Sequence, residues 1–172
     1  DPESVCTCRI KRIESIISKL KRNNQTPINR IQDIAGCRCI LSEERQLLKL
    51  YDFILKNENN FPFKIHNKHN YLSEPKESGY KSIHIIVSLK EDEKKKVEVQ
   101  LRCLSHHNWA TMVEITDILC GTKIKEYGEQ SNPELFKFHL LLSKSSLSLK
   151  EINYIADVAI KYNYVRRLQK IF

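Results

Sequence analysis

Two carboxylates stand among basic residues in this sequence, in surroundings that are typical of a site for phosphate. Asp33 comes just before a short apolar run, and Glu98 lies inside the alternating segment VEVQLRC. Side chains two residues apart point to the same face of a strand, so Gln100 and Arg102 share the face of Glu98. Carboxylate oxygens that leave positions for phosphate are what Mg²⁺ requires in a nucleotide site. Asp33 and Glu98 are therefore candidate metal ligands and candidate catalytic residues.

Each carboxylate also has an ordinary structural explanation, and both explanations stay open. An antiparallel strand with one solvated face produces the pattern of VEVQLRC, and Asp33 is typical of a turn. The four glycines stand at positions 36, 79, 121 and 128, so the chain has neither a P-loop nor a GxGxxG motif. Nucleotide folds that depend on those two motifs are excluded.

The segment EPKESGYKSIH, residues 74–84, is an unusual entrance to a buried strand. It combines a proline, a lysine, a glycine and a tyrosine just before regular apolar alternation begins. Gly79 allows a sharp backbone turn, and such an exposed segment is explained if a ligand contacts it. We interpret the segment as part of a nucleotide-binding site.

Apolar periodicity predicts an α+β fold, with a small mixed, largely antiparallel sheet flanked by helices and a helical C-terminus. We expect one domain over residues 1–172, with a core at about 9–120 and C-terminal helices at about 132–172. Ser42 is expected to cap the second helix, Pro62 to mark an edge strand, and residues 90–96 to form a charged turn between antiparallel strands. The expected helices cover residues 12–21, 43–57, 105–120, 133–147 and 149–171, and the expected strands cover 35–41, 61–66, 82–89 and 97–102.

Composition indicates a soluble globular domain with a positive field. The 29 lysines and arginines against 21 aspartates and glutamates give a formal net charge of +8, which favours polyphosphates or nucleic acid as partners. Six cysteines include two C-x-C pairs but no C-x-x-C couplet, so we expect free thiols. The sequence has no secretory leader and no apolar run of spanning length, so we expect a cytoplasmic domain with no membrane partner.

Five motifs in order resemble the synthetase domain of the RelA/SpoT family. They are R-x-K at Arg9 and Lys11, DIAGCRCI from Asp33, YLSEPKESGYKSIH from Tyr71, VEVQLRC from Val97 and HNWA from His107. The resemblance implies a nucleotidyltransferase-like sheet and Mg²⁺-dependent transfer of pyrophosphate from ATP to the 3′-hydroxyl of an acceptor ribose, with release of AMP.

The resemblance also implies a role for each matching residue. Asp33 matches a magnesium ligand, and Glu98 matches a residue that completes the metal site or acts as base on the 3′-hydroxyl. Three residues match basic residues that hold ATP in the family: Arg9, Lys11 and Arg38. Residues that contact the acceptor nucleotide in the family correspond to Lys76, Tyr80 and His84 in this chain. Ser78 stands at a position of the acceptor site where many family members have asparagine. Gln100 and Arg102 are expected to support Glu98.

The acceptor stays open between three readings. The first is GDP or GTP, which would give the alarmone (p)ppGpp. The helix HNWATMVEITDILCG resembles toxic small alarmone synthetases, which implies the second, the 3′-terminal adenosine of the tRNA CCA end with an antitoxin partner. The third is a non-catalytic RNA-binding module. The chain lacks the His-Asp dipeptide of the family's hydrolase domain, so we expect synthesis without degradation; homo-oligomer formation is left open.

Overall fold

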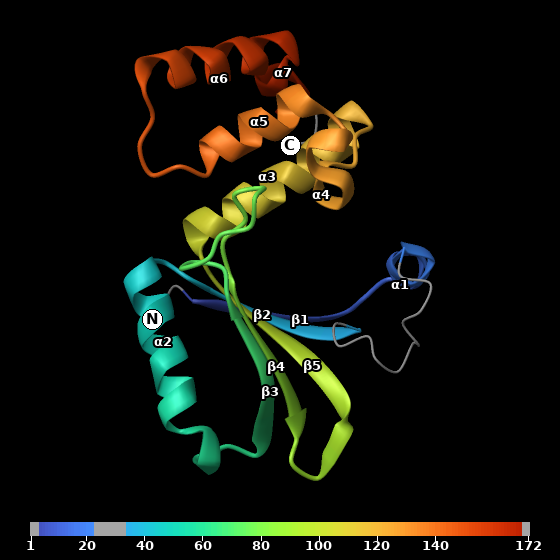
Figure 1. Ribbon diagram of the computed structural model, residues 1–172, viewed down its shortest axis with the longest axis vertical. Helices are drawn as coiled ribbons and strands as arrows, with labels where there is room; N and C mark the ends of the chain where they lie inside the picture. The colour runs from blue at the N-terminus through green and yellow to red at the C-terminus, as the bar shows by residue number, and fades with distance from the viewer. Residues whose placement is uncertain (1–3, 23–33, 170–172) are drawn as a thin grey trace. The chain divides into compact units, whose positions relative to one another are not determined.

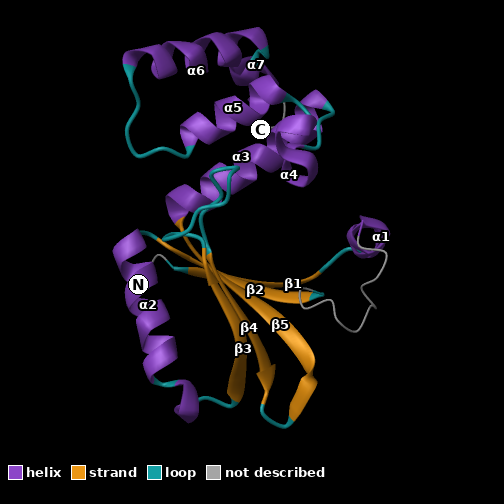
Figure 2. Cartoon of the chain, in the orientation of Figure 1, coloured by secondary structure: helices purple, strands orange, loops and turns teal. Residues whose placement is uncertain are grey.

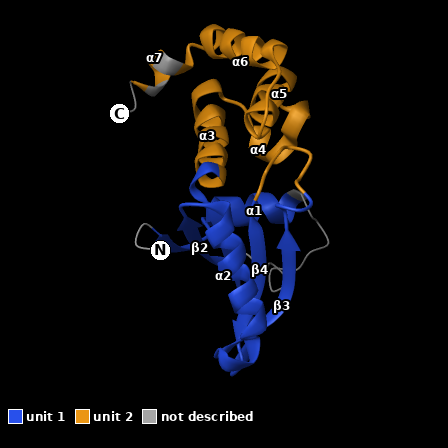
Figure 3. Cartoon of the chain, turned by 90° about the vertical axis from the view of Figure 1, so that its left-hand side faces the viewer, with its two compact units in different colours: residues 1–74, 82–105 blue, residues 75–81, 106–172 orange. Residues whose placement is uncertain are grey.

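The computed structural model describes residues 4–22 and 34–169. Contacts divide the chain into two compact units, and each is described by itself (Figure 3). Unit 1 comprises residues 1–74 and 82–105, and unit 2 comprises residues 75–81 and 106–172. The expected single domain remains a prediction. No helix within the described ranges is long and apolar enough to cross a membrane.

Unit 1 is built on a five-stranded sheet (Figure 2). Only β2 and β5 run parallel, and the other neighbouring strands are antiparallel. The fold is therefore α+β with a mixed, mainly antiparallel sheet, as the sequence predicts. In spatial order the strands are β1 (Val5–Ile10), β2 (Ala35–Leu41), β5 (Asp92–Cys103), β4 (Ile83–Leu89) and β3 (Phe63–Asn70).

One face of this sheet packs against helix α2 (Glu44–Lys56), which lies along it in Figure 1. Ile83 of β4 and Leu101 of β5 are directly opposed, and the alternation of side chains along the strands places both on this face. Both are fully buried. Leu47 of α2 is 0% exposed and completes the contact. The polar side chains of β4 and β5 are consequently left for the opposite face. Unit 1 also holds α1 (Ile13–Arg22) and the short 3-10 helix η2 (Glu58–Asn60).

Unit 2 is helical and has its own core. Asn132 caps its central helix by accepting a hydrogen bond from the Leu135 backbone N–H at 2.9 Å, with Pro133 in the first turn. Leu135, Phe138 and Val158 are buried together in this core. The helices are α3 (Leu104–Cys120, whose first two residues belong to unit 1), α4 (Ile124–Tyr127), η3 (Gly128–Gln130), α5 (Pro133–Leu142), α6 (Leu149–Lys161) and α7 (Tyr164–Leu168).

Strand β1 is absent from the strands that the sequence predicts, the first of which covers residues 35–41. All six residues of β1 are exposed, and the six-residue segment VCTCRI has no buried apolar side chain to mark it as a strand. Its place in the sheet comes from backbone pairing with β2 over the register Val5↔Ile40 to Ile10↔Ala35. Long-range pairing of this kind leaves little trace in local composition.

Several predicted boundaries also need correction. The second helix is capped by Glu43 rather than Ser42, because the Gln46 side chain accepts the Glu43 backbone N–H at 3.3 Å and closes a capping box. Strand β5 begins at Asp92, so most of the expected charged turn is strand. The charged residues at the start of β5 are largely exposed, and there Glu93 forms an ion pair with Lys64 at 2.9 Å.

The C-terminal helices are shorter than expected. Helix α5 ends at Leu142, where the Ser143 hydroxyl donates to the Leu140 carbonyl at 2.7 Å. The single helix expected over 149–171 is divided into α6 and α7. Asn163 adopts a left-handed backbone with φ of 53°, which an α-helix cannot continue through. Strand β3 is an edge strand, as predicted, but starts after Pro62 and extends to Asn70.

Candidate active site

A row of polar side chains crosses the face of the sheet opposite to α2. Thr7 in β1 is directly opposed to Arg38 in β2, Arg38 to Gln100 in β5, and Gln100 to His84 in β4. Glu98 lies two residues before Gln100 and therefore on the same face. Strand register thus brings together residues that are more than 90 positions apart in the sequence.

Both carboxylate oxygens of Glu98 are held by hydrogen-bond donors. His84 Nδ1 lies 2.9 Å from Oε1, and Gln100 Nε2 donates to Oε2 at 2.7 Å. The side chains of Glu98 and His84 are only 17% and 12% exposed. Two hydrogen bonds, one to each oxygen, fix the orientation of this partly buried carboxylate.

Gln100 connects this carboxylate to two guanidinium groups. Its Oε1 accepts from Arg102 Nη2 at 3.1 Å and lies 3.4 Å from Arg38 Nε. Arg102 is 5% exposed, which is unusual for a charged side chain and indicates a structural role in this network. The arrangement places fixed positive charge close to a fixed negative charge, a pattern suited to binding phosphate beside a proton acceptor.

A small cleft of about 50 Å³ opens on this face, at the side of β1 and β2. Gly36 forms part of its wall, and a Cβ atom there would lie 3.3 Å from the Glu98 carbonyl oxygen. The cleft is far smaller than a typical ligand pocket, so only a small group of about the size of a phosphate fits inside it. Its lining residues are Thr7, Arg9, Gly36, Cys37, Arg38, Glu98 and Gln100.

The structure brings together only some of the residues that the sequence singled out. Lys11 follows β1, donates its backbone N–H to the Ile34 carbonyl at 2.7 Å, and is not part of the cleft lining. Asp33 lies outside the described residues. Lys76, Ser78 and Tyr80 belong to unit 2 and are treated below.

Sequence reasoning missed Thr7, Gly36 and Tyr71. Thr7 and Gly36 line the cleft, and the Tyr71 ring meets the His84 ring edge-on at 5.2 Å between centroids. The register of β1 against β2 identifies Thr7, but this register cannot be found without recognising β1 as a strand. Tyr71 was part of a quoted motif, and its position just after β3 was the available signal.

In unit 2, the segment 75–81 presents Tyr80 between an aromatic ring and a cation. The Tyr80 ring centroid lies 6.5 Å from that of Trp109, at an interplanar angle of 59°, and Lys76 Nζ lies 5.3 Å from the Tyr80 centroid. Tyr80 is half-buried and Lys76 is exposed. One side of the Tyr80 ring is therefore positioned by protein contacts, which orients the ring for stacking.

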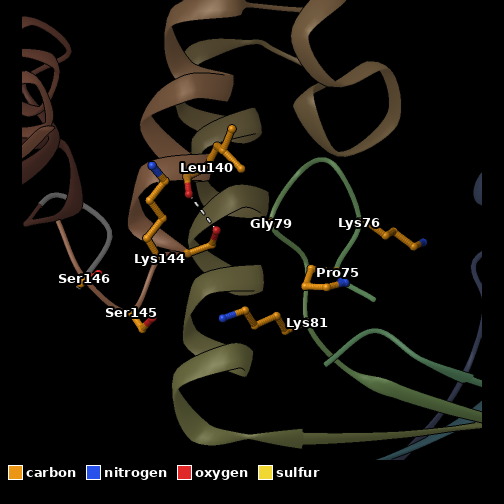
Figure 4. A pocket seen from close by; sticks show the side chains of 9 residues that line it. Pro75, Lys76, Gly79, Lys81, Leu140, Lys144, Ser145 and Ser146 are labelled. Atoms are coloured by element: carbon orange, nitrogen blue, oxygen red, sulfur yellow. Dashed lines mark hydrogen bonds between the residues drawn. The ribbon is translucent and has the colours of Figure 1, made fainter. Parts of the chain in front are cut away.

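The same segment lines a second pocket, of about 430 Å³, which is within the usual range for small ligands (Figure 4). Three lysines and three serines give it a polar, basic wall. In Figure 4 the side chains of Lys76 and Lys81 leave the segment on opposite sides. Lys144 Nζ donates a hydrogen bond to Glu151 Oε1 at 2.6 Å. The lining residues are Pro75, Lys76, Gly79, Lys81, Leu140, Ser143, Lys144, Ser145 and Ser146.

Gly79→Ala is expected to destabilise unit 2 clearly more than Gly121→Ala. Both glycines have positive φ, 84° and 64°, which costs alanine about 1 kcal/mol. A Cβ at Gly79 would in addition overlap Ser143 Oγ and Cβ, whereas a Cβ at Gly121 meets nothing within 4 Å. Thermal melts of the two variants measure the difference. Equal losses of stability would mean that segment 75–81 does not pack tightly on α5.

The fold and the polar sheet face define an α+β domain with a mixed sheet, in which a carboxylate is held among arginines. The family follows from the sequence: residues 8–117 match the profile described as the region found in RelA / SpoT proteins. This match covers more than half of the chain, and the chain belongs to that family, as its motifs indicated.

Two curated relatives from Bacillus subtilis are similar to this chain. GTP pyrophosphokinase YjbM is 33% identical over 121 residues, which are 64% of this chain and 54% of YjbM. GTP pyrophosphokinase YwaC is 29% identical over 114 residues, 60% of this chain and 53% of YwaC. The chain spans about half the length of these relatives.

Solved structures agree on the fold. The crystal structure of small alarmone synthetase 1 from Bacillus subtilis bound to its product pppGpp matches with a TM-score of 0.67 and 22% identity, over 94% of this chain and 77% of that one. A GTP pyrophosphokinase family protein from Streptococcus pneumoniae matches with a TM-score of 0.63 and 22% identity, over 98% and 79%. The resemblance to the toxic subgroup remains a prediction.

Proposed function

We propose that this domain transfers pyrophosphate from ATP to the 3′-hydroxyl of GDP or GTP, giving (p)ppGpp. The observation that carries the proposal is Glu98, whose two oxygens are held by His84 and Gln100 beside a cleft lined by Arg9 and Arg38. The names of the two curated relatives and the product in the structural relative support a guanine nucleotide as acceptor. A reaction that consumes ATP is consistent with a cytoplasmic protein.

In this proposal Glu98 is the proton acceptor. A ribose hydroxyl must lose its proton as it attacks phosphorus, and a carboxylate within hydrogen-bond reach assists that step. The hydrogen bonds from His84 and Gln100 hold the Glu98 carboxylate in one orientation before substrate arrives, so the base needs no reorganisation. Arg9 and Arg38 bind the ATP phosphates, for which the guanidinium fork is suited, and Lys11 adds positive charge.

Mg²⁺ belongs to the same proposal. The Glu98 carboxylate fits such an ion, because its oxygens are hard donors of the kind that Mg²⁺ prefers. Within residues 4–22 and 34–169 no group of three or more His, Cys, Asp or Glu side chains converges. Asp33, outside the described residues, is the proposed second protein ligand. When bound, the ion would offset the charge of the ATP phosphates.

The acceptor is proposed to stack on Tyr80 and to contact Lys76 and Ser78 with its polar groups. Tyr80→Ala is expected to raise the KM for the acceptor by about 5-fold to 150-fold, because one stacked base contributes about 1–3 kcal/mol. The KM for ATP is expected to change little. Steady-state kinetics with each substrate varied in turn measures both values.

Tyr127→Ala is the matched control, since Tyr127 is a 47% exposed tyrosine of the same unit. An acceptor KM that is unchanged in Tyr80→Ala, or equally raised in both variants, would remove Tyr80 from the acceptor site. Thermal melts establish that both variants are folded.

The reaction is tested with ATP labelled in its terminal phosphates, with Mg²⁺ and with GDP, GTP, ATP or deacylated tRNA as parallel acceptors. Label on GDP or GTP is the expected result. Label on tRNA that is lost when the terminal adenosine is removed would instead identify a translation toxin, for which an antitoxin partner is to be sought. Absence of transfer to every acceptor would contradict the proposal and favour an RNA-binding module.

A further inference from the structure

Four of the six cysteines meet on the ribbon formed by β1 and β2. The antiparallel register places Cys8 directly opposite Cys37 and Cys6 directly opposite Cys39. Because each C-x-C pair spans two residues, all four side chains leave the same face of the ribbon. The sequence shows the two C-x-C pairs, but only the pairing of the strands shows that they face each other.

The distances suit a covalent bond between the strands. Cys8 Sγ and Cys37 Sγ are 2.7 Å apart, so formation of a disulfide bond of about 2.05 Å needs a movement of well under 1 Å. Directly opposed residues of antiparallel strands have Cα atoms about 4.5–5.5 Å apart, which lies inside the range that disulfides require. The backbone therefore needs no rearrangement.

Their surroundings give the two members of each pair different roles. Cys6 and Cys8 are exposed on the edge strand, whereas Cys37 and Cys39 are half-buried. A hydrogen bond with Cys8, together with burial, raises the pKa of the Cys37 thiol to about 11. Burial, together with a hydrogen bond with Cys6, raises the pKa of Cys39 to about 12. The exposed members are thus the ones that an oxidant reaches first.

A metal site explains these cysteines less well. Within the described ranges, no group of three or more metal-ligating side chains has the arrangement to hold an ion. The sulfur atoms are instead arranged as two facing pairs. Pairwise opposition is the geometry of disulfide formation and not of four ligands around one ion.

We propose that Cys8 and Cys37 are a disulfide-forming site that reacts with low-molecular-weight disulfides such as oxidised glutathione, with Cys6 and Cys39 as a second pair on the same ribbon. The Cys8 thiolate attacks one sulfur of the oxidant, whose S–S bond breaks and releases one molecule of thiol. Cys37 then loses its proton and attacks the Cys8 sulfur of the mixed disulfide, which releases a second molecule of thiol. The protein loses two hydrogen atoms and the oxidant is reduced by two electrons.

This bond would tie an edge strand to the rest of the sheet. Within the sheet β1 pairs with β2 alone, and all of its residues are exposed. The other face of the same two strands carries Thr7, Arg9 and Arg38, which line the cleft beside Glu98. Oxidation would therefore fix the two strands that form this wall, whatever reaction the cleft serves.

The test treats the whole folded chain with oxidised glutathione, blocks the remaining thiols at low pH and maps tryptic peptides without reduction. Trypsin cleaves after Arg9, Arg38 and Arg45, so Cys37 and Cys39 fall in different peptides while Cys6 and Cys8 stay together. The expected product is a peptide ending at Arg9 linked to the peptide ending at Arg38. It should disappear in Cys8→Ser and persist in Cys6→Ser. Amide exchange in β1 should slow after oxidation.

Cys120 serves as the control thiol. It is half-buried, burial raises its pKa, and it lies 3.7 Å from Arg167 Nη1 instead of a second sulfur. The free thiols of Cys8 and Cys37 are expected to be oxidised at least about tenfold faster than that of Cys120. Six thiols that remain free after treatment, or disulfides formed equally often with Cys103 and Cys120, would overturn the proposal.

Discussion

Glu98→Gln is expected to reduce pyrophosphate transfer at least about a thousandfold, because it removes a positioned proton acceptor. The substitution keeps the size of the side chain but replaces one oxygen with an NH₂ group. His84 Nδ1 and Gln100 Nε2 both donate toward this side chain, so one of them would face another donor. The free energy of unfolding is expected to fall by about 1–3 kcal/mol for that reason.

Glu93→Gln is the matched control for this prediction. Glu93 lies in the same strand, and its partner is Lys64 at 2.9 Å with both side chains about half exposed. Exposed pairs contribute little to stability, so this variant should retain both activity and melting temperature. Initial rates with labelled ATP and thermal melts separate the two effects. Transfer by Glu98→Gln at near wild-type rate would mean that another group takes the proton.

The polar face around Glu98 was predictable in part from sequence. Alternation in VEVQLRC places Glu98, Gln100 and Arg102 on one face of a strand, and the apolar residues between them explain the other face. The pairing of β5 with β4 and the strand limits of β2 and β4 also follow from local apolar patterns. What local patterns cannot supply is register between distant strands, which brings Arg38 opposite Gln100 and Gln100 opposite His84.

The errors have the same origin. Strand β1 is a short edge strand with no buried residue, so Thr7 and Arg9 could not be placed on the sheet from local composition. The helix expected over 149–171 has a continuous polar and apolar pattern, whereas in the structure it breaks at Asn163, just before Tyr164, which is buried in the core of unit 2. Segment 75–81 was expected to be exposed with a turn at Gly79, but Gly79 is buried against Ser143. That contact joins residues about 60 positions apart, so local sequence gives no sign of it.

Unit 2 contains a buried polar network whose direction of hydrogen bonding can be deduced. The Thr116 hydroxyl donates its one proton to the Met112 carbonyl at 2.9 Å. It must therefore accept from Tyr164 OH at 2.7 Å and from His139 Nε2 at 2.9 Å. His139 therefore carries a proton on Nε2, and its side chain is 1% exposed.

The stability of unit 2 is expected to fall as the pH decreases from about 6.5 to about 4. Burial lowers the pKa of His139 from 6.5 to about 4, although the charge of Asp117 acts in the opposite direction. Between these values the unfolded chain binds a proton that the folded unit does not, so protons favour unfolding. The loss by pH 4 is about 3 kcal/mol, and above pH 6.5 this contribution is fully present and constant.

The variant His139→Gln isolates this effect, because the Gln Nε2 can still donate to Thr116 but does not titrate. Its stability should stay flat between pH 6.5 and about 4.5, whereas His69→Gln, at an exposed position of β3, should keep the wild-type dependence. Two carboxylates of unit 2 also titrate, but at lower pH. Lys161 lowers the pKa of Glu134, and Lys144 lowers the pKa of Glu151. Their contribution to the free energy of unfolding is therefore lost only at lower pH, and equally in every variant.

Trp109 makes the measurement specific to unit 2. It is the single tryptophan of the chain, and its Nε1 donates to the His139 carbonyl at 2.8 Å. Denaturant titrations followed by tryptophan fluorescence therefore monitor the helix that carries the titrating histidine. A wild-type midpoint that does not change between pH 6.5 and 4.5, or one that changes equally in His139→Gln, would show that His139 is not buried as the neutral form. If the denaturation midpoint falls with pH in the wild type but stays constant in His139→Gln, the acid sensitivity of unit 2 is due to the buried His139 ring.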